Sequence, residues 1–284
     1  MTAGETSRGL LELTRPVNAI AASVLTFIGA FVAGGVADQP LAVVVAVVTT
    51  GLAVGAGNAI NDYFDRDIDR INQPERAIPR GAVSPRGALA FSIVCFVVAV
   101  GLALTLTRLA IAIAAINLVA LVVYTELFKG LPGLGNALVA YLVGSTFLFG
   151  AAAVGSVGEA IVLFVLAGVA TLTREIIKDV EDIEGDREEG LQTLPIAIGE
   201  RRALVVATAL LVGAVVASPL PFVLGYFGVA YLLVVVPADV IMLYAAYESF
   251  EDPTAGQSHL KYGTFVAALA FIVGRAAGEL PALG

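Results

Sequence analysis

The 284-residue chain has no tryptophan, one cysteine, one histidine and few charged residues, which make up only 14% of it. The single cysteine, Cys95, excludes an internal disulfide and a cysteine-based metal site. A soluble domain has about 25% charged residues, whereas this chain is 58% hydrophobic and its mean hydropathy is +0.92. The shortage of charge therefore indicates an all-α protein that crosses a membrane several times.

Positive charge is also scarce, because the net charge is −8 and lysine supplies only 3 of the 16 basic residues. This balance argues against nucleic acid as a partner. An acidic, lysine-poor composition would also suit a cytoplasm of high salt concentration. No segment indicates an obligate protein partner.

Long uncharged runs predict nine membrane helices, because about 20 apolar residues span a bilayer. The predicted ranges are 16–37, 41–65, 87–106, 109–127, 134–155, 160–182, 203–218, 221–247 and 262–279. With the N-terminus in the cytoplasm, 14 of the 16 basic residues lie on the cytoplasmic side, and only Arg108 and Arg275 lie outside. This distribution agrees with the positive-inside rule. We therefore expect one intramembrane domain over residues 1–284, with nine spans and a cytoplasmic N-terminus.

Two segments break the apolar pattern, and both fall on the predicted cytoplasmic side. The first acidic motif, NDYFDRDID, covers residues 61–69 and follows the second predicted helix. Its Asn61, Asp65 and Asp69 are spaced by four residues, which places them along one face of a helix. The second acidic motif, KDVEDIEGD, covers residues 178–186 and repeats this spacing with Asp182 and Asp186. One such motif is typical of a solvated helix end, but two on the same side indicate a shared site.

Oxygen ligands of this kind suit Mg²⁺, which is often shared with substrate phosphates. Facing each other, the two motifs would form a cup for metal ions that bridge a diphosphate, while Arg and Lys bind the remaining phosphate oxygens. Such a site would stabilise a leaving diphosphate as an allylic carbocation develops. The cation would need a dry, apolar or aromatic-lined chamber, which a helical bundle can supply.

The two motifs resemble the paired aspartate-rich motifs of the UbiA superfamily of intramembrane prenyltransferases. The resemblance extends to RPVN at 15–18, RAIPRG at 76–81, the segment 124–144 and GLQTLP at 190–195. It implies nine helices around a central cavity whose cytoplasmic mouth carries the acidic motifs. Within the superfamily, the motifs look most like those of archaeal enzymes that transfer geranylgeranyl from its diphosphate to geranylgeranylglyceryl phosphate. This implies an enzyme of ether-lipid biosynthesis in the cell membrane, which opens to the cytoplasm.

The resemblance also implies roles for individual residues. The metal ligands would be Asn61, Asp65, Asp69, Asp182 and Asp186, with Mg²⁺ as the cofactor. Asp62 and Asp179 would support them, and Asp62 or the diphosphate itself would take the proton of the acceptor. Tyr124 would stabilise positive charge near the reacting carbon. The diphosphate would contact Arg76, Arg80, Lys129 and Lys178, whereas Arg15 and Asn18 would lie near the acceptor, with Arg15 on its phosphate.

Other interpretations stay open from the sequence alone. An aromatic acceptor such as 4-hydroxybenzoate would use the same diphosphate site, and an ion-coupled transporter would also carry intramembrane carboxylates. The carboxylates here gather at helix ends on one side, which favours an enzyme. Two polar residues within predicted helices are also ambiguous. Asn136 suits either a hydrogen bond between helices or the site, and Asp239 suits either the cavity or the membrane interface.

Overall fold

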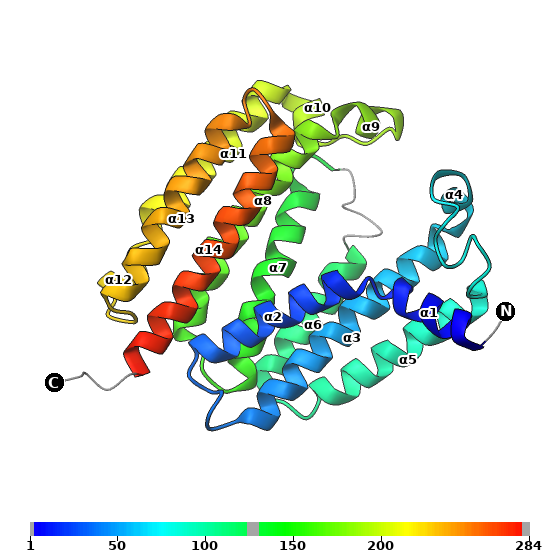
Figure 1. Cartoon of the computed structure of the whole chain (residues 1–284), viewed down its shortest axis with the longest axis horizontal. Helices are drawn as coiled ribbons and strands as arrows, with labels where there is room; N and C mark the ends of the chain where they lie inside the picture. The colour runs from blue at the N-terminus through cyan, green and yellow to red at the C-terminus, as the bar shows by residue number, and fades with distance from the viewer. Residues whose placement is uncertain (1–2, 124–130, 280–284) are drawn as a thin grey trace.

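A computed structural model describes residues 3–123 and 131–279, and it contains only helices and their connections within these ranges (Figure 1). The helices are α1 (Ala3–Leu13), α2 (Pro16–Val32), α3 (Pro40–Phe64), α4 (Arg66–Asn72), α5 (Pro85–Ala103), α6 (Arg108–Val123), α7 (Leu134–Ala153), α8 (Gly158–Glu181), α9 (Ile183–Glu188), α10 (Leu194–Ile198), α11 (Glu200–Ala217), α12 (Leu220–Val223), α13 (Val229–Glu248) and α14 (Pro253–Glu279).

Each of the nine predicted ranges falls on one of the longer helices, namely α2, α3, α5, α6, α7, α8, α11, α13 and α14. Seven helical segments of the described chain are long and apolar enough to cross a membrane, and α2 would add an eighth if it forms one span with α1, from which a 50° bend separates it. The apolar helix α6 is shorter, with 16 residues. The all-helical, multi-pass architecture is confirmed, whereas the count of nine spans and the cytoplasmic N-terminus stay predictions.

Three predicted boundaries were wrong by several residues. The range 16–37 ends too late, because α2 ends at Val32. The range 221–247 begins too early, because the chain turns after α12 at Gly225, where φ is +74°, and α13 starts only at Val229. The range 262–279 begins too late, because α14 starts at Pro253. Its first turn is capped by Asp252, whose Oδ1 accepts a hydrogen bond from the Ala255 amide at 3.0 Å. A capped, polar first turn is typical of a helix that starts outside the apolar layer.

Helices α2 and α7 cross in direct backbone contact. A Cβ atom on Gly29 would lie 2.0 Å from the carbonyl oxygen of Phe147, and one on Gly150 would lie 1.9 Å from that of Thr26. Small residues allow this close approach between membrane helices. Beside the crossing, the hydroxyls of Thr26 and Thr50 are hydrogen bonded at 2.8 Å, which ties α2 to α3 as well.

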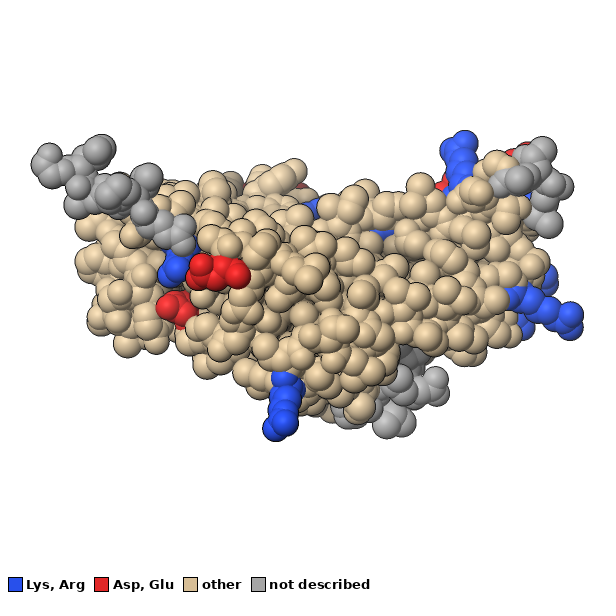
Figure 2. Space-filling model, turned by 90° about the horizontal axis from the view of Figure 1, so that it is seen from below, with Lys and Arg blue, Asp and Glu red and all other residues tan. Residues whose placement is uncertain are grey.

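The face of the bundle that Figure 2 shows is mostly uncharged. Large apolar side chains are exposed on many of its helices, including Val97 on α5, Val216 on α11 and Leu233 on α13. In Figure 1, α4 and α9 both lie towards the upper right, whereas α12 lies on the left, below the middle of the view. The charged segments therefore gather towards one end, and the apolar surface between the ends suits contact with lipid chains.

Candidate functional site

The first acidic motif spans the junction between α3 and α4. Asn61 and Asp62 lie in the last turn of α3, Asp65 joins the two helices and Asp69 lies in α4. The amide of Asp65 donates to the carbonyl of Asn61, and the amide of Asp69 donates to that of Asp65, both at 2.9 Å. The predicted four-residue spacing is therefore kept across a helix end, where we had expected one continuous face.

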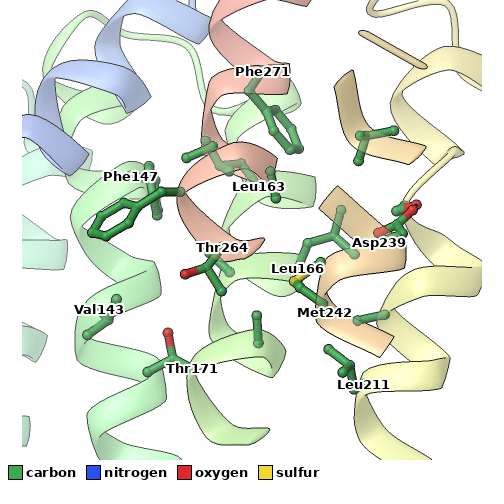
Figure 3. Close-up of a pocket in the computed structure, with 18 of the residues that line it drawn as sticks. Val143, Phe147, Leu163, Leu166, Thr171, Leu211, Asp239, Met242, Thr264 and Phe271 are labelled. Atoms are coloured by element: carbon green, nitrogen blue, oxygen red, sulfur yellow. The ribbon is translucent and has the colours of Figure 1, made fainter. Parts of the chain in front are cut away.

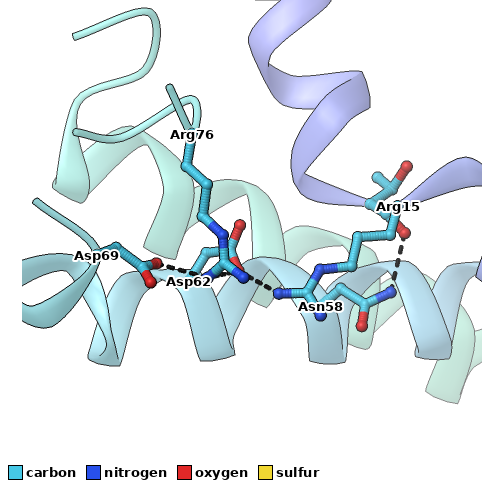
Figure 4. Close-up of polar contacts among 6 residues, drawn as sticks. Arg15, Asn58, Asp62, Asp69 and Arg76 are labelled. Atoms are coloured by element: carbon cyan, nitrogen blue, oxygen red, sulfur yellow. Dashed lines mark hydrogen bonds and ion pairs between the residues drawn. The ribbon is translucent and has the colours of Figure 1, made fainter. Parts of the chain in front are cut away.

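Two arginines bind the buried carboxylates of this motif (Figure 4). Asp62 is 6% exposed and accepts a hydrogen bond from Nη2 of Arg15 at 2.7 Å. Nη1 of Arg76 lies 2.6 Å from Oδ2 of Asp69 and 3.4 Å from Oδ1 of Asp62. The sequence predicts both arginines on substrate phosphates, which stays a prediction, whereas the structure shows them paired with Asp62 and Asp69. Asp65, by contrast, is exposed.

The backbone of Arg15 is unusual, because among the described non-glycine residues only Arg15 has a positive φ, of 47°. It precedes Pro16, the first residue of α2, and the side-chain amide of Asn58 donates to the neighbouring Thr14 carbonyl at 3.0 Å. A left-handed conformation costs roughly 1–2 kcal/mol in a residue with a side chain. The ion pair with Asp62 helps to hold Arg15 in this conformation, and strain of this kind clusters at functional sites.

We predict that Asp62→Ala lowers the free energy of unfolding by about 2 kcal/mol. Breaking a buried pair costs about 3–5 kcal/mol, and we expect less here because the Arg15 side chain is 40% exposed. Chemical unfolding in detergent measures the change. Asp67→Ala is the matched control, because the Asp67 side chain is 67% exposed where it pairs with Arg66 and Arg70. Equal stability of the two variants would show that the Asp62 pairs contribute nothing.

Arg80 has its partners outside both acidic motifs. Its Nη2 lies 2.5 Å from Oε2 of Glu12, and its Nη1 donates to the Glu75 carbonyl at 2.7 Å. This contact fastens α1 to the loop after α4, where Leu13 is buried against Ile78 and Val83. The predicted contact of Arg80 with a diphosphate therefore stays a prediction, in competition with a structural role.

Of three other predicted site residues, the structure describes one. The side chain of Asn18 is exposed on the first turn of α2. Tyr124 and Lys129 lie outside the described residues.

The second acidic motif begins on α8 and continues into α9. Oδ2 of Asp179, in the last turn of α8, accepts a hydrogen bond from Nδ2 of Asn136 at 2.8 Å, so Asn136 makes a bond between helices, one of the two roles that the sequence left open. Lys178 Nζ lies 3.8 Å from Oδ2 of Asp182, which is exposed. Burial raises the pKa of Asp186 above the ordinary value, and the nearby charge of Asp182 acts in the same direction. This motif therefore keeps more uncompensated negative charge than the first.

No three His, Cys, Asp or Glu side chains among residues 3–123 and 131–279 lie close enough together to hold a metal ion. The cup in which both motifs face one diphosphate therefore stays a prediction. The donor set itself suits a hard divalent cation, because Asn61, Asp65, Asp69, Asp182 and Asp186 all offer oxygen atoms.

An apolar cavity of about 190 Å³ lies among α7, α8, α11, α13 and α14 (Figure 3). Its walls include Phe147, Leu163, Met242 and Phe271. Thr171 lines it eight residues before Asp179, so it lies about 12 Å along α8 from the second acidic motif. The cavity is apolar and partly aromatic, whereas its use as the chamber for an allylic cation stays a prediction.

The sequence left Asp239 either in a cavity or at the membrane interface. The structure places it on the wall of this cavity. It is 8% exposed, and its Oδ2 accepts a hydrogen bond from Oγ of Ser218 at 2.6 Å. The hydroxyl of Tyr231 donates to the Ser218 carbonyl at 2.7 Å. These bonds connect the end of α11 to α13 and satisfy polar groups in an apolar surrounding.

The sequence pattern of the UbiA prenyltransferase family matches residues 22–272, which is most of the chain. The chain belongs to this family. UbiA relatives with similar sequences include the digeranylgeranylglyceryl phosphate synthase of Natronomonas pharaonis, 65% identical over 274 residues, with 96% of this chain and 99% of the relative covered. The enzyme of the same name from Halobacterium salinarum is 60% identical, with 95% and 98% covered.

Solved UbiA structures show the same fold. One, described as giving insights into the biosynthesis of digeranylgeranylglyceryl phosphate synthase in membranes, has a TM-score of 0.86 and 36% identity, with 96% of this chain and 99% of that chain covered. A UbiA homologue from Archaeoglobus fulgidus bound to DMAPP and Mg²⁺ has a TM-score of 0.70 and 20% identity, with 95% and 99% covered. The second likeness concerns the fold alone.

Proposed function

We propose that this UbiA enzyme transfers a geranylgeranyl group from geranylgeranyl diphosphate to the free hydroxyl of geranylgeranylglyceryl phosphate. The observation that carries the proposal is the identity of 60–65% over nearly the whole chain with two synthases of digeranylgeranylglyceryl phosphate. In the reaction, the allylic C–O bond breaks and diphosphate leaves. The hydroxyl oxygen of the acceptor then forms the ether bond and releases its proton.

The acidic motifs are proposed to hold Mg²⁺, through Asn61, Asp65 and Asp69 on one side and Asp182 and Asp186 on the other. When bound, Mg²⁺ would stabilise the negative charge that develops on the leaving diphosphate. The presence of Mg²⁺ and a prenyl diphosphate in the homologue from Archaeoglobus fulgidus supports a requirement for the metal, whereas the choice of ligands rests on the two motifs.

The remaining predicted residues would bind and orient the substrates. Arg76 and Lys178 would bind the diphosphate, joined by Arg80 and Lys129, while Arg15 and Asn18 would lie near the acceptor phosphate. Tyr124 would stabilise the allylic cation. Asp62 or the diphosphate itself is proposed to take the proton of the acceptor, and Asp179 to support the second motif. The apolar cavity beside α8 would exclude water from this chemistry.

The orientation in the membrane is part of the same proposal. A cytoplasmic N-terminus and nine spans would place both acidic motifs at the cytoplasmic face, where water-soluble diphosphate can leave. The bias of the basic residues towards that side supports this orientation.

One experiment tests the proposal. Purified protein with Mg²⁺ and geranylgeranyl diphosphate is incubated with geranylgeranylglyceryl phosphate or with 4-hydroxybenzoate, and prenylated product and diphosphate are measured. We expect the ether product with the first acceptor and no product after chelation of the metal. Prenylation of 4-hydroxybenzoate alone would overturn the acceptor assignment. Transport of a solute into vesicles without diphosphate release would show that the protein is a transporter and would overturn the assignment as an enzyme.

A further inference from the structure

The two acidic motifs can be aligned residue by residue. Asn61, Asp62, Asp65 and Asp69 align with Lys178, Asp179, Asp182 and Asp186 at the same spacing. Asp62 and Asp179 therefore occupy the same position, one residue into each motif and in the last turn of the helix that carries it.

The structure gives these two aspartates partners in corresponding places. Asp62 on α3 is bound by Arg15, which immediately precedes α2, at 2.7 Å. Asp179 on α8 is bound by Asn136, in the first turn of α7, at 2.8 Å. In each case the donor comes from the start of the helix that precedes the motif helix along the chain. The equivalence of Asp62 and Asp179 thus extends to their surroundings.

The two partners differ in charge. Arg15 is a cation that cancels the charge of Asp62, and Arg76 adds a second one. Asn136 is a neutral amide and 8% exposed, so it fixes Asp179 without cancelling its charge. The first motif contains a carboxamide of its own in Asn61, where the second has Lys178. The second motif has no carboxamide at this position of its sequence. Asn136 supplies one from another helix.

We propose that Asn136 is a positioning residue of the second acidic motif, which holds the Asp179 carboxylate in place with its negative charge available to a bound cation. The inference rests on the proposed function, since it assigns a metal-binding role to the second motif. Partners that orient the groups around a metal typically change affinity by 10–100-fold when they are removed. Asn136 acts on the metal only through Asp179.

The test measures Mn²⁺ binding by electron paramagnetic resonance, in detergent and without prenyl substrate. Asn136→Leu keeps the branching and the number of heavy atoms of the side chain and removes the donor, and the smaller Asn136→Ala is a second variant. We expect both to weaken Mn²⁺ binding about tenfold. In an Asp179→Asn background, Asn136→Leu should not weaken Mn²⁺ binding further, because the carboxylate that Asn136 positions has already been removed.

Gln39→Ala is the matched control for general stability. The Gln39 side-chain amide also bonds another helix end, donating to the Val154 carbonyl at 2.8 Å. Its loss should lower the unfolding temperature and leave Mn²⁺ binding unchanged. If both Asn136 variants bind Mn²⁺ like the wild type, the positioning role is wrong. If the wild type binds no Mn²⁺ and releases no diphosphate, the proposed function fails instead.

Discussion

Asp182→Ala is expected to lower the rate of prenyl transfer by about a thousandfold or more, and Asp65→Ala should have an effect of the same size. Groups that stabilise charge in the transition state contribute on this scale when one of them is removed. Both side chains are exposed, so neither replacement opens a hole in the core of the protein. The measurement is diphosphate release under saturating substrates, together with the unfolding temperature in detergent.

Each of these variants has a control in its own segment. Asp67 belongs to the first motif but falls outside its four-residue spacing, and Glu184 is an exposed residue of α9. Asp67→Ala and Glu184→Ala should keep the rate within about twofold, because screened surface charges contribute little. Near-normal turnover of Asp65→Ala or Asp182→Ala would contradict the proposed metal site.

Gly150→Ala is expected to lower the free energy of unfolding by about 3 kcal/mol, because overpacking in a close contact forces the backbone to shift. The added methyl group would lie 1.9 Å from the carbonyl oxygen of Thr26, and a backbone atom cannot turn away as a side chain does. The helices α2 and α7 would have to separate. Chemical unfolding in detergent measures the loss.

Gly101→Ala is the control for this prediction. Gly101 lies inside α5, and a Cβ atom there would meet nothing within 4 Å. Alanine should be neutral or stabilise the helix by about 0.5–1 kcal/mol, since glycine is the poorer helix former. If Gly150→Ala and Gly101→Ala are equally stable, the crossing of α2 and α7 is more yielding than the structure indicates.

The helices themselves could be predicted from the sequence. A long uncharged run inside a bilayer forms a helix, because its backbone N–H and C=O groups must be hydrogen bonded within the segment. The spacing of Asn61, Asp65 and Asp69 also predicted a helical repeat, which persists through the junction at Asp65. Boundaries were less certain where polar residues form helix. The first turns of α14 contain His259 and Lys261, and no apolar pattern indicates that they continue the helix.

The partners of the site residues could not be derived in this way. Arg15 and Asp62 are 47 positions apart, and Asn136 and Asp179 are 43 apart. Only the packing of α2 on α3 and of α7 on α8 brings them together. The same holds for Arg80, whose contact with Glu12 spans 68 positions. Local spacing identifies the carboxylates, whereas their counter-charges depend on tertiary structure.

The glycine crossing of α2 and α7 has a mechanical consequence. Gly29 follows Arg15 by 14 residues, and Gly150 follows Asn136 by 14 residues. The crossing is therefore a pivot with two arms of equal length, about 21 Å each at ~1.5 Å per residue. A rotation of about 5° at the pivot would displace the end of an arm by ~2 Å, and misplacement by ~1 Å can cost about 100-fold in rate. A change at either glycine is therefore expected to shift the carboxylate partners of both motifs, although it lies far from them.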